Sequence, residues 1–377
     1  MSQETQSSRM KYIDKHAYFR CLELSVSESC NYQCRYCIFW RNNRRRALMS
    51  QELALAVTDK YLDYLEYHAQ NIRQPLIYFG TGEPLLSWPT INTVSRHVRR
   101  RMPSLRLSLI TNGSLVTPEI LRSAKDLCID VGLSIDGERK TQNLNRPMQQ
   151  SGRPIDTYQA VIDALELGRS IDFPFYSLSA TYNRPGFTQD ALHVLSLCEK
   201  YSIREFALDY DISSLTPENY QDVAEELLSL YAIAREKQIG VFGYWLIPYL
   251  NQKEGDGFHC YCGNSAANSI CITPDGEIKV CGYDPRSFGM LSDFESILQN
   301  PEYRAYLQHY NDGSEDCQGC ELYTLCCGQC IFGDRSQEAW QVNCRFMKYL
   351  MEKLREGDES NAEGKAFPQA GDPLHDE

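Results

Sequence analysis

The chain has 377 residues, of which 42% are hydrophobic, and 50 Asp and Glu residues outnumber 38 Lys and Arg residues for a net charge of −12. This length and composition predict one large or two modest domains with an apolar core. The acidic balance argues against a nucleic-acid-binding protein, which needs a basic surface. The short basic run at residues 41–46 (RNNRRR) is interpreted as solvated surface.

Residues 1–20 are predicted to be a polar N-terminal extension. They contain no apolar segment of the kind found in signal peptides. The sequence also lacks the roughly 18 consecutive apolar residues of a membrane span. We therefore predict a cytoplasmic protein that binds neither membranes nor nucleic acids. In that compartment its 16 cysteines favour metal or redox chemistry over disulfides.

From residue 22 onwards, short β-type runs alternate with longer amphipathic helical patterns. Strands are predicted at residues 22–27, 76–79, 106–111, 129–135, 175–181 and 205–210. Helices are predicted at residues 50–68, 89–101, 117–127, 156–169, 187–200 and 217–237. Such a succession predicts an α/β fold of parallel strands with right-handed crossovers, either an open sheet or a partial barrel.

Polar and cysteine-containing motifs follow most of these strands. They are the loop that begins at Cys30, GTGEP (80–84), TNG (111–113), SIDG (134–137) and the pair Asp209 and Asp211. Because functional groups gather at the carboxyl ends of parallel strands, the motifs are predicted to meet in one site.

The pattern changes after residue 249. A linker-like stretch, QKEGDG (252–257), precedes a region, residues 260–344, that holds ten of the 16 cysteines. This predicts a small domain held by metal rather than by a large apolar core. The acidic C-terminal stretch is poor in apolar residues and predicts a disordered tail. The predicted domains are thus 21–250 and 251–350, followed by a tail at 351–377.

Cys30, Cys34 and Cys37 form a tight loop of three thiols without a nearby fourth ligand. A structural zinc site closes its shell with four ligands, whereas three thiolates on a four-iron cluster leave one iron open. The open iron is the favoured interpretation. A zinc knuckle completed by a remote ligand is the alternative.

This CxxxCxxC loop, with Tyr36 before its last cysteine, resembles that of radical S-adenosylmethionine (radical SAM) enzymes. The resemblance implies that the open iron chelates the amino and carboxylate groups of S-adenosylmethionine (SAM). It also implies that an electron from the [4Fe-4S] cluster produces a 5′-deoxyadenosyl radical that abstracts hydrogen from the substrate. Tyr36 would lie by the adenine. An electron donor such as flavodoxin or ferredoxin is implied as a partner.

Further motifs extend the resemblance. GTGEP resembles the Gly-Gly-Glu-Pro motif of the family, with Thr81 in place of the first glycine. Gly82 would allow close approach to SAM, and Glu83 or its neighbours would bind the methionine ammonium group. Ser134 and the pair Asn145 and Arg146 resemble the ribose and carboxylate contacts of the family; purely structural roles are the alternative.

The C-terminal cysteines resemble the SPASM extension of radical SAM enzymes, which carries two auxiliary [4Fe-4S] clusters. The matching segments are CGNSAANSICITPDGEIKVC (262–281) and CQGCELYTLCCGQC (317–330), followed by Cys344. The resemblance implies an outer cluster held by Cys317, Cys320, Cys326 and Cys344. It implies an inner cluster held by Cys281, Cys330, Cys262 and either Cys260 or Cys271. Cys327, which directly follows Cys326, is expected to be a bystander. Cys21, Cys128 and Cys198 are expected to be buried, and zinc stays the alternative metal.

Taken together, these resemblances imply a partial (β/α)6 TIM-like barrel with a C-terminal iron–sulfur SPASM domain. They favour a peptide maturase that forms a side-chain crosslink, carbon–carbon or thioether, in a ribosomally made precursor peptide. The alternatives are formylglycine formation on a protein, dehydrogenation of a small molecule and a non-catalytic zinc scaffold. Formylglycine-forming relatives carry an Asp base directly after the residue that corresponds to Cys281, where this chain has Gly282.

The short segment before the first strand leaves no room for a fused leader-binding domain. Leader recognition is therefore expected from a separate peptide-binding protein or from the surfaces of the two domains. Oxidative bond formation also releases a proton, for which Asp209, Asp211 and Asp284 are the candidate bases. Tyr210, Tyr244 and Trp245 either line a peptide cleft or belong to the core.

Overall fold

The computed structural model describes residues 13–14, 17–39, 47–150, 152–253, 267–309, 317, 320–326 and 336–362. The chain forms two compact units. The larger unit comprises residues 10–176 and 263–310, and the smaller unit comprises residues 1–9, 177–262 and 311–377. No helix in the described part of the chain is long and apolar enough to cross a membrane.

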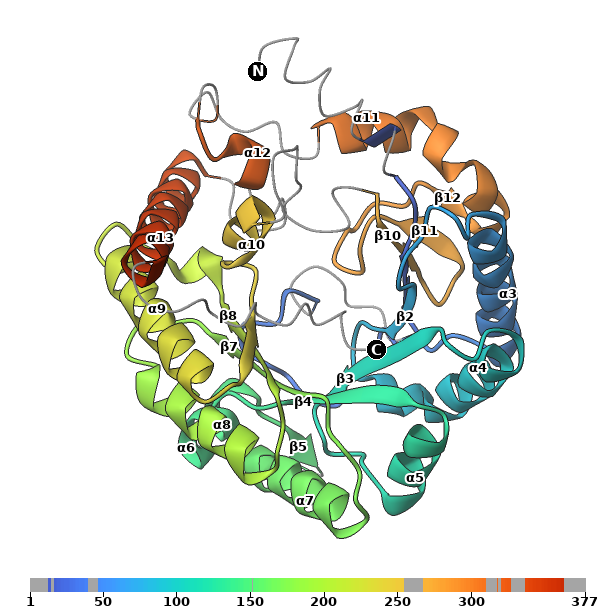
Figure 1. Ribbon diagram of the computed structural model, residues 1–377. Helices are drawn as coiled ribbons and strands as arrows, with labels where there is room; N and C mark the ends of the chain where they lie inside the picture. The colour runs from blue at the N-terminus through green and yellow to red at the C-terminus, as the bar shows by residue number, and fades with distance from the viewer. Residues whose placement is uncertain are drawn as a thin grey trace. The chain divides into compact units, whose positions relative to one another are not determined.

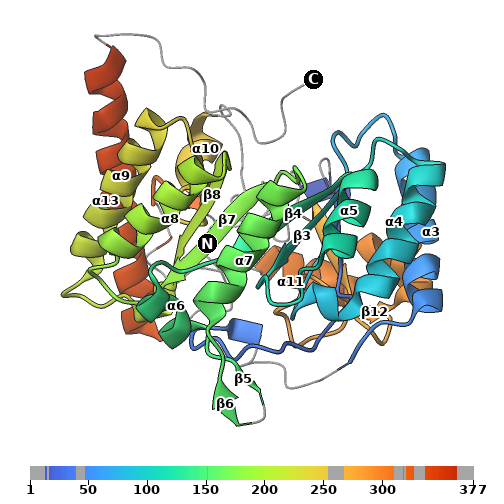
Figure 2. The same cartoon turned by 90° about the horizontal axis from the view of Figure 1, so that it is seen from below.

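The larger unit is built around strands in the order β12-β11-β10-β1-β2-β3-β4. These strands are β1 (Cys21–Leu24), β2 (Leu76–Phe79), β3 (Arg106–Thr111), β4 (Ile129–Ser134), β10 (Ser269–Ile272), β11 (Glu277–Lys279) and β12 (Gly289–Met290). Strands β10, β1, β2, β3 and β4 pair in parallel, whereas β11 and β12 pair antiparallel. A small hairpin, β5 (Gln149–Gln150) and β6 (Arg153–Pro154), projects away from this unit (Figure 2).

Helices connect the parallel strands of the larger unit. They are α3 (Gln51–Tyr67), α4 (Trp88–Arg101), α5 (Pro118–Asp126), α6 (Arg139–Asn145), α7 (Thr157–Ser170) and α11 (Pro301–His309), with 3₁₀ turns at Pro84–Ser87 and Leu291–Gln299. Ser50, Thr117 and Asp156 start three of them by accepting a hydrogen bond from a first-turn N–H, which satisfies a donor that the helix itself leaves open. Helices α3, α4 and α5 lie along the outer side of the sheet (Figure 1).

The two faces of this sheet differ in polarity. Leu22, Leu24, Ile77 and Phe79 are fully buried and alternate with side chains that keep some exposed surface. In the strand register, Cys271 on β10 lies beside Glu23 on β1, which lies beside Tyr78 on β2. The row continues through Ser108 on β3 to Asp130 on β4. Because register neighbours point to the same face, the inner face carries a row of mostly polar groups, which we call the polar row.

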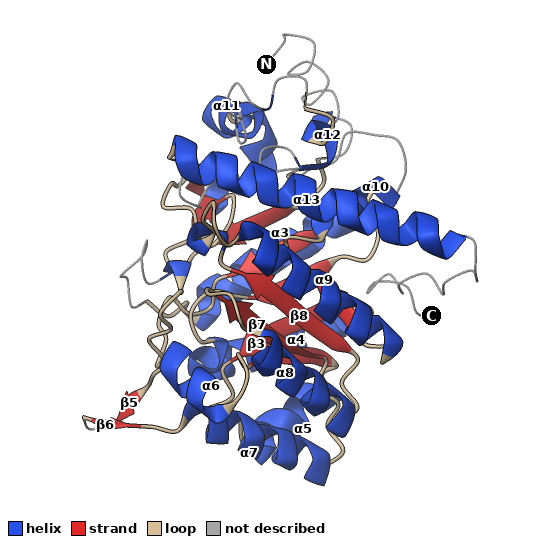
Figure 3. Ribbon diagram, turned by 90° about the vertical axis from the view of Figure 1, so that its left-hand side faces the viewer, coloured by secondary structure: helices blue, strands red, loops and turns tan. Residues whose placement is uncertain are grey.

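The smaller unit contains three parallel strands in the order β7-β8-β9. These strands are β7 (Ser177–Tyr182), β8 (Glu205–Tyr210) and β9 (Gly240–Phe242). The helices are α8 (Thr188–Lys200), α9 (Tyr220–Glu236), α10 (Ile247–Lys253), α12 (Tyr323–Cys326) and α13 (Gln337–Ala362), with a 3₁₀ turn at Ile212–Ser214. Helix α13 packs against α9 (Figure 3), and Tyr349 on α13 donates a hydrogen bond to Glu225 on α9.

All six predicted strands are present within three residues of their predicted bounds, and each is followed by a helix as expected. Two features differ from the prediction. Helix α13 continues to Ala362, so the predicted start of a disordered tail at residue 351 is wrong; residues 363–377 lie outside the described residues. Strand β10 comes from the predicted second domain, yet it pairs directly with β1. The predicted domain boundaries remain a prediction.

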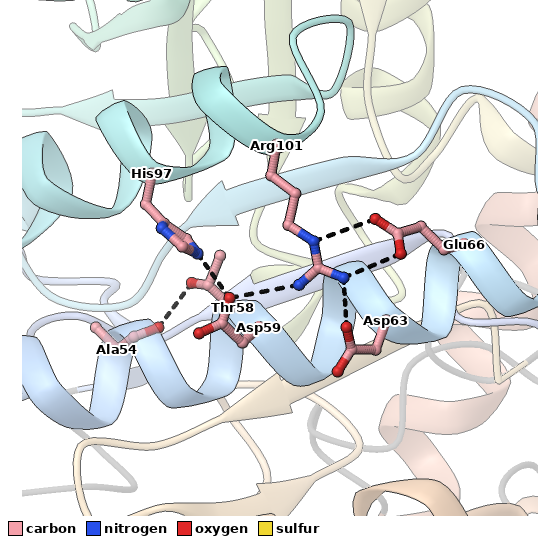
Figure 4. Close-up of polar contacts among 7 residues, drawn as sticks. All are labelled: Ala54, Thr58, Asp59, Asp63, Glu66, His97 and Arg101. Atoms are coloured by element: carbon pink, nitrogen blue, oxygen red, sulfur yellow. Dashed lines mark hydrogen bonds and ion pairs between the residues drawn. The ribbon is translucent and has the colours of Figure 1, made fainter.

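A charge cluster joins α4 to α3 on the outer side of the larger unit (Figure 4). Arg101 on α4 donates to both carboxylate oxygens of Glu66 at 3.1 and 3.0 Å and also pairs with Asp63 and Asp59. His97 lies 2.6 Å from Asp59 in the same cluster. Because one guanidinium offsets three carboxylates, its loss leaves them to repel one another.

We expect Arg101→Gln to lower the free energy of unfolding by about 1 kcal/mol at low ionic strength. The loss should shrink at high salt, since screening weakens both the attraction and the remaining repulsion. Thermal unfolding at two salt concentrations measures this, with Lys125→Gln as the control because Lys125 pairs with Asp172 alone and both are exposed. A loss that does not depend on salt would show that Arg101 acts through packing instead.

Candidate functional site

The cysteine loop follows β1 and is held by backbone hydrogen bonds from several directions. The N–H groups of Gln33 and Arg35 donate to the carbonyls of Pro147 and Asn145, each at 2.9 Å. Within the loop, the Cys37 N–H donates to the Cys34 carbonyl at 3.2 Å. These bonds fix the three half-buried cysteines on a loop whose backbone leaves little freedom.

The thiols of this loop lie close to one another. The charges of Cys34 and Cys37 raise the pKa of Cys30, and burial, the largest cause, brings the pKa of both Cys30 and Cys34 to about 12. A thiol in such surroundings ionises when a metal centre takes the place of its proton. Among the described residues, no three His, Cys, Asp or Glu side chains are arranged around one metal ion. Three thiolates suit an iron–sulfur cluster, in which each thiolate binds a different iron atom.

The GTGEP loop packs directly on the segment before Cys30. A Cβ atom on Gly82 would lie 2.2 Å from the carbonyl oxygen of Ser29, so only glycine fits. The Glu83 N–H donates to the same carbonyl at 2.8 Å. Thr81 has a φ of 68°, a left-handed conformation that is strained for a β-branched residue and free of strain for glycine. Having threonine at residue 81, where the family motif has glycine, therefore costs backbone strain.

Glu83 is buried and links two of the predicted motifs. Its carboxylate accepts hydrogen bonds from the Thr111 hydroxyl at 2.6 Å, the Asn112 N–H at 2.8 Å and the Leu85 N–H at 3.1 Å. Burial raises its pKa to about 7 despite these donors. With three of its acceptor positions used by the protein, Glu83 is arranged to hold the GTGEP and TNG loops together.

The TNG motif also reaches the cysteine loop. The Asn112 amide donates to Asn31 at 2.8 Å, and the Asn31 amide donates to the Ser114 hydroxyl at 2.8 Å. Asn31 directly follows Cys30 in the chain. The carboxyl ends of β1, β2 and β3 are therefore tied together around the first cysteine.

The SIDG motif contributes a buried charge network that sequence reasoning missed. Asp136, which is fully buried, accepts hydrogen bonds from the Tyr36 hydroxyl at 2.9 and 2.7 Å. Arg146 donates to the same carboxylate at 2.9 Å, and its guanidinium carbon lies 5.4 Å from the centre of the Tyr36 ring. An acid two residues after the end of a strand, within the SIDG motif, was the signal available for Asp136.

The predicted SAM-binding residues lie around this network. Ser134 ends β4, Asn145 ends α6, and Arg146 caps that helix. All three are buried. The structure thus brings together Tyr36, Asp136 and Arg146, while their roles toward SAM remain predictions.

A second junction connects β1 to the turn after Cys281. Glu23 accepts a hydrogen bond from the Gly282 N–H at 3.1 Å and from the Thr81 hydroxyl at 3.5 Å. A Cβ atom on Gly282 would lie 2.4 Å from the Glu23 carboxylate, so a larger residue here would displace that side chain. Glu23 was not among the predicted site residues, because a single acid on a short strand carries no motif.

The predicted outer-cluster cysteines come together in the smaller unit. Cys344 on α13 hydrogen-bonds to Cys317, which with the charges of Cys326 and Cys320 raises the pKa of the Cys344 thiol. In the larger unit, Cys281 lies close enough to Cys271 to raise its pKa. The other predicted inner-cluster ligands, Cys260, Cys262 and Cys330, lie outside the described residues. Their assignment therefore remains a prediction.

The three cysteines expected to be buried differ from one another. Cys198 on α8 is buried and Cys21 on β1 is partly buried, but Cys128 is exposed. Cys128 follows α5 with a φ of 48°, a left-handed conformation that turns the chain at the helix end. The prediction that Cys128 is buried is wrong, because it stands in a turn and not on a strand.

The three candidate bases have different surroundings. Asp209 ends β8 and accepts a hydrogen bond from the Tyr244 N–H at 2.8 Å, and burial raises its pKa to about 7. Asp211 caps the following 3₁₀ turn through Ser213. Asp284 is buried and pairs with Arg286 at 3.0 Å. The three acids therefore differ in their surroundings, and the identity of the base remains a prediction.

The aromatic residues near Asp209 differ in how much of their surface is exposed. Trp245 and Tyr210 are buried, and the Trp245 indole N–H donates to the Leu208 carbonyl at 2.8 Å. Tyr244 keeps 45% of its surface exposed, so it is the one of the three that is open to a ligand.

Comparisons with known protein families agree with both cysteine patterns. Residues 24–198 match the model of the radical SAM superfamily. Residues 260–321 match the iron–sulfur cluster-binding SPASM domain. The chain contains a radical SAM domain and a SPASM domain. The resemblance drawn from the cysteine spacings is therefore confirmed.

Curated relatives of this radical SAM–SPASM chain include enzymes that act in different ways. It is 26% identical over 345 residues to the radical SAM cyclopropyl synthase TigE of Paramaledivibacter caminithermalis, covering 87% of this chain and 71% of the relative. It is 22% identical over 335 residues to the cysteine-type anaerobic sulfatase-maturating enzyme of Clostridium perfringens, covering 81% and 86%.

Solved structures of similar proteins establish the fold. The sulfatase-maturating enzyme anSMEcpe with bound AdoMet matches with a TM-score of 0.73 and 19% identity, covering 92% of this chain and 100% of that chain. Streptococcus suis SuiB bound to precursor peptide SuiA matches with a TM-score of 0.62 and 14% identity, covering 89% and 77%. The chain has the TIM-like α/β fold of radical SAM enzymes with an unclosed sheet and a C-terminal SPASM domain, as predicted. These domains imply [4Fe-4S] clusters and SAM as cofactors.

Proposed function

We propose that this radical SAM enzyme is a peptide maturase that crosslinks side chains of a ribosomally made precursor peptide through a carbon–carbon or thioether bond. The observation that carries the proposal is the pairing of a three-thiol loop with the SPASM cysteine set in one chain. The relatives of this chain include a sulfatase-maturating enzyme, and SuiB, which has the same fold, binds a precursor peptide. A peptide or protein substrate is therefore favoured over a small molecule.

We assign the cofactors to the residues as follows. Cys30, Cys34 and Cys37 hold the cluster that binds SAM, and Cys317, Cys320, Cys326 and Cys344 hold the outer auxiliary cluster. The inner auxiliary cluster, the third, uses Cys281, Cys330, Cys262 and one of Cys260 and Cys271. When bound, the clusters and SAM supply a 5′-deoxyadenosyl radical, which removes a hydrogen atom from the substrate. A flavodoxin or ferredoxin is the proposed electron donor.

The chain's own residues have two tasks in this scheme. Tyr36, Asp136 and Arg146 form the buried network beside the cysteine loop. This network would hold the Tyr36 side chain in position at the SAM site. Asp209 accepts the proton that the substrate loses as the new bond closes. The substrate would lose one hydrogen atom to the 5′-deoxyadenosyl radical, one proton to Asp209 and one electron, for which the inner auxiliary cluster would be the acceptor; together these account for the two hydrogens missing from an oxidised crosslink.

A second candidate is closure of a cyclopropane ring within the peptide substrate. It is favoured by the similarity to TigE, a cyclopropyl synthase, across 87% of this chain. Ring closure also removes two hydrogens, so it needs the same cofactors and the same proton acceptor. Formylglycine formation is less well supported, because Gly282 stands where that reaction uses an acid.

The test is turnover of short peptides encoded by genes that neighbour the gene of this enzyme. Anaerobically reconstituted protein, SAM and a reductant are expected to form 5′-deoxyadenosine and a peptide lighter by two hydrogens. Tandem mass spectrometry and NMR then distinguish a bond between two residues from a ring within one. A product carrying formylglycine, or turnover of small molecules alone, would contradict the proposal.

A further inference from the structure

We propose that Glu23, Tyr78 and Tyr283 form a binding subsite for a cationic nitrogen of the substrate, either an amine or a guanidinium group. The inference rests on the peptide-modifying function proposed above and adds the chemistry by which the substrate is held. It concerns the larger unit alone, since all three residues lie in it.

The three side chains are neighbours in the polar row and the turn beside it. Glu23 and Tyr78 are register partners on β1 and β2. A Cβ atom on Gly80 would lie 2.7 Å from the Tyr78 ring and 3.1 Å from Cγ of Glu23, so both side chains occupy the space beside this glycine. Tyr283 follows Gly282, whose N–H binds Glu23, and it lies within the electrostatic range of both Glu23 and Tyr78.

The charge of Glu23 has no counter-charge in the described part of the chain. Its two hydrogen-bond donors, the Gly282 N–H and the Thr81 hydroxyl, are neutral, and no described Lys, Arg or His forms an ion pair with it. An ionised carboxylate taken out of water is costly unless a cation accompanies it. The other acid of the polar row, Asp130, differs in this respect, because Arg106 pairs with it at 2.9 Å.

The two tyrosines present unused polar atoms next to this carboxylate. Neither hydroxyl makes a hydrogen bond to a described residue. Tyr283 keeps 44% of its surface exposed, and Tyr78 is partly exposed. An ammonium or guanidinium group carries several N–H donors, which a carboxylate and two phenol oxygens are suited to accept. The net charge of −12 also attracts a cationic substrate.

The test measures binding and not turnover. Ligand-observed NMR follows n-butylammonium and its neutral counterpart n-butanol in the presence of the anaerobically reconstituted enzyme without SAM. We expect n-butylammonium to bind and n-butanol to bind at least about tenfold more weakly. Glu23→Gln should weaken n-butylammonium binding at least about tenfold, whereas Asp130→Asn, which removes an already paired charge, should not.

Tyr283→Phe provides a variant at an exposed position, where folding is not at risk; it should weaken n-butylammonium binding by a smaller factor, about threefold to tenfold. Equal binding of n-butylammonium and n-butanol to the wild-type enzyme, or no binding of either, overturns the proposal without any variant. Unchanged binding by folded Glu23→Gln protein overturns it as well. Production of 5′-deoxyadenosine by the same wild-type preparation, after SAM and dithionite are added, shows whether the proposed radical SAM function itself holds.

Discussion

Replacing Cys30, Cys34 and Cys37 together with alanine is expected to abolish production of 5′-deoxyadenosine from SAM. The three thiols lie on one loop, where burial and the charge of Cys37 raise the pKa of Cys30 and Cys34, and they have no alternative role in the core. Without them no protein ligand remains for the cluster, so no electron reaches SAM. Chromatographic detection of 5′-deoxyadenosine after anaerobic incubation with dithionite measures the effect.

Cys198→Ala is the control for this variant. Cys198 is buried on α8 and is not part of the cysteine loop, so 5′-deoxyadenosine should still form. Iron analysis should show that the triple variant keeps its auxiliary clusters while losing about a third of its iron. If the triple variant still produces 5′-deoxyadenosine, these cysteines do not hold the catalytic cluster.

Asp209→Asn is expected to lower the rate of peptide product formation about 10²- to 10⁴-fold, the range found for loss of a general base. The amide has nearly the same shape and can keep the hydrogen bond from Tyr244, but it accepts no proton. Because hydrogen abstraction precedes proton loss, 5′-deoxyadenosine should continue to form without a matching amount of product. The ratio of the two compounds measures this uncoupling.

The pH profile of the wild-type enzyme should follow the pKa of Asp209. With that pKa raised to about 7 by burial, the base is ionised above pH 7 and product formation should fall as the pH drops below it.

The effect of the raised Asp209 pKa on the stability of the fold has the opposite dependence on pH. Since the ordinary pKa is about 4, the folded state binds more protons between these values, and the contribution of Asp209 to stability is lost as pH rises through about 7.

Asp209→Asn should therefore be at least as stable as the wild type at pH 8 while being far less active. Asp211→Asn is the matched control, because Asp211 caps the turn after β8 and should affect stability more than product formation. A flat rate between pH 6 and pH 8, or full product formation by Asp209→Asn, would exclude Asp209 as the base.

Much of the larger unit's site was predictable because it is built from local motifs. The alternation of apolar residues places Leu22, Leu24, Ile77 and Phe79 on one face, which defines the strands and their direction. Motifs at the ends of parallel strands must then meet, and the contacts of Asn112 with Asn31 show that they do. Local pattern and strand polarity are sufficient for this part.

Residues whose role depends on distant partners were not predictable. Asp136 and Glu23 matter because of what lies opposite them: Tyr36 and Arg146 in one case, and Gly282, 259 residues away in sequence, in the other. The differences among the three candidate bases could not be predicted either. Asp209, Asp211 and Asp284 look alike in sequence, and only burial, a capped turn and an ion pair distinguish them.

The sequence by itself determined the chemistry of this protein. Thiols at x3 and x2 spacing, and a second cysteine set near the C-terminus, are local arrangements whose ligand geometry depends on a few covalently linked residues. Only the tertiary structure decided how β10 joins β1, which glycines are required by close packing, and which acids retain an unmatched charge. These properties depend on burial and on partners distant in the chain, and no local pattern encodes either.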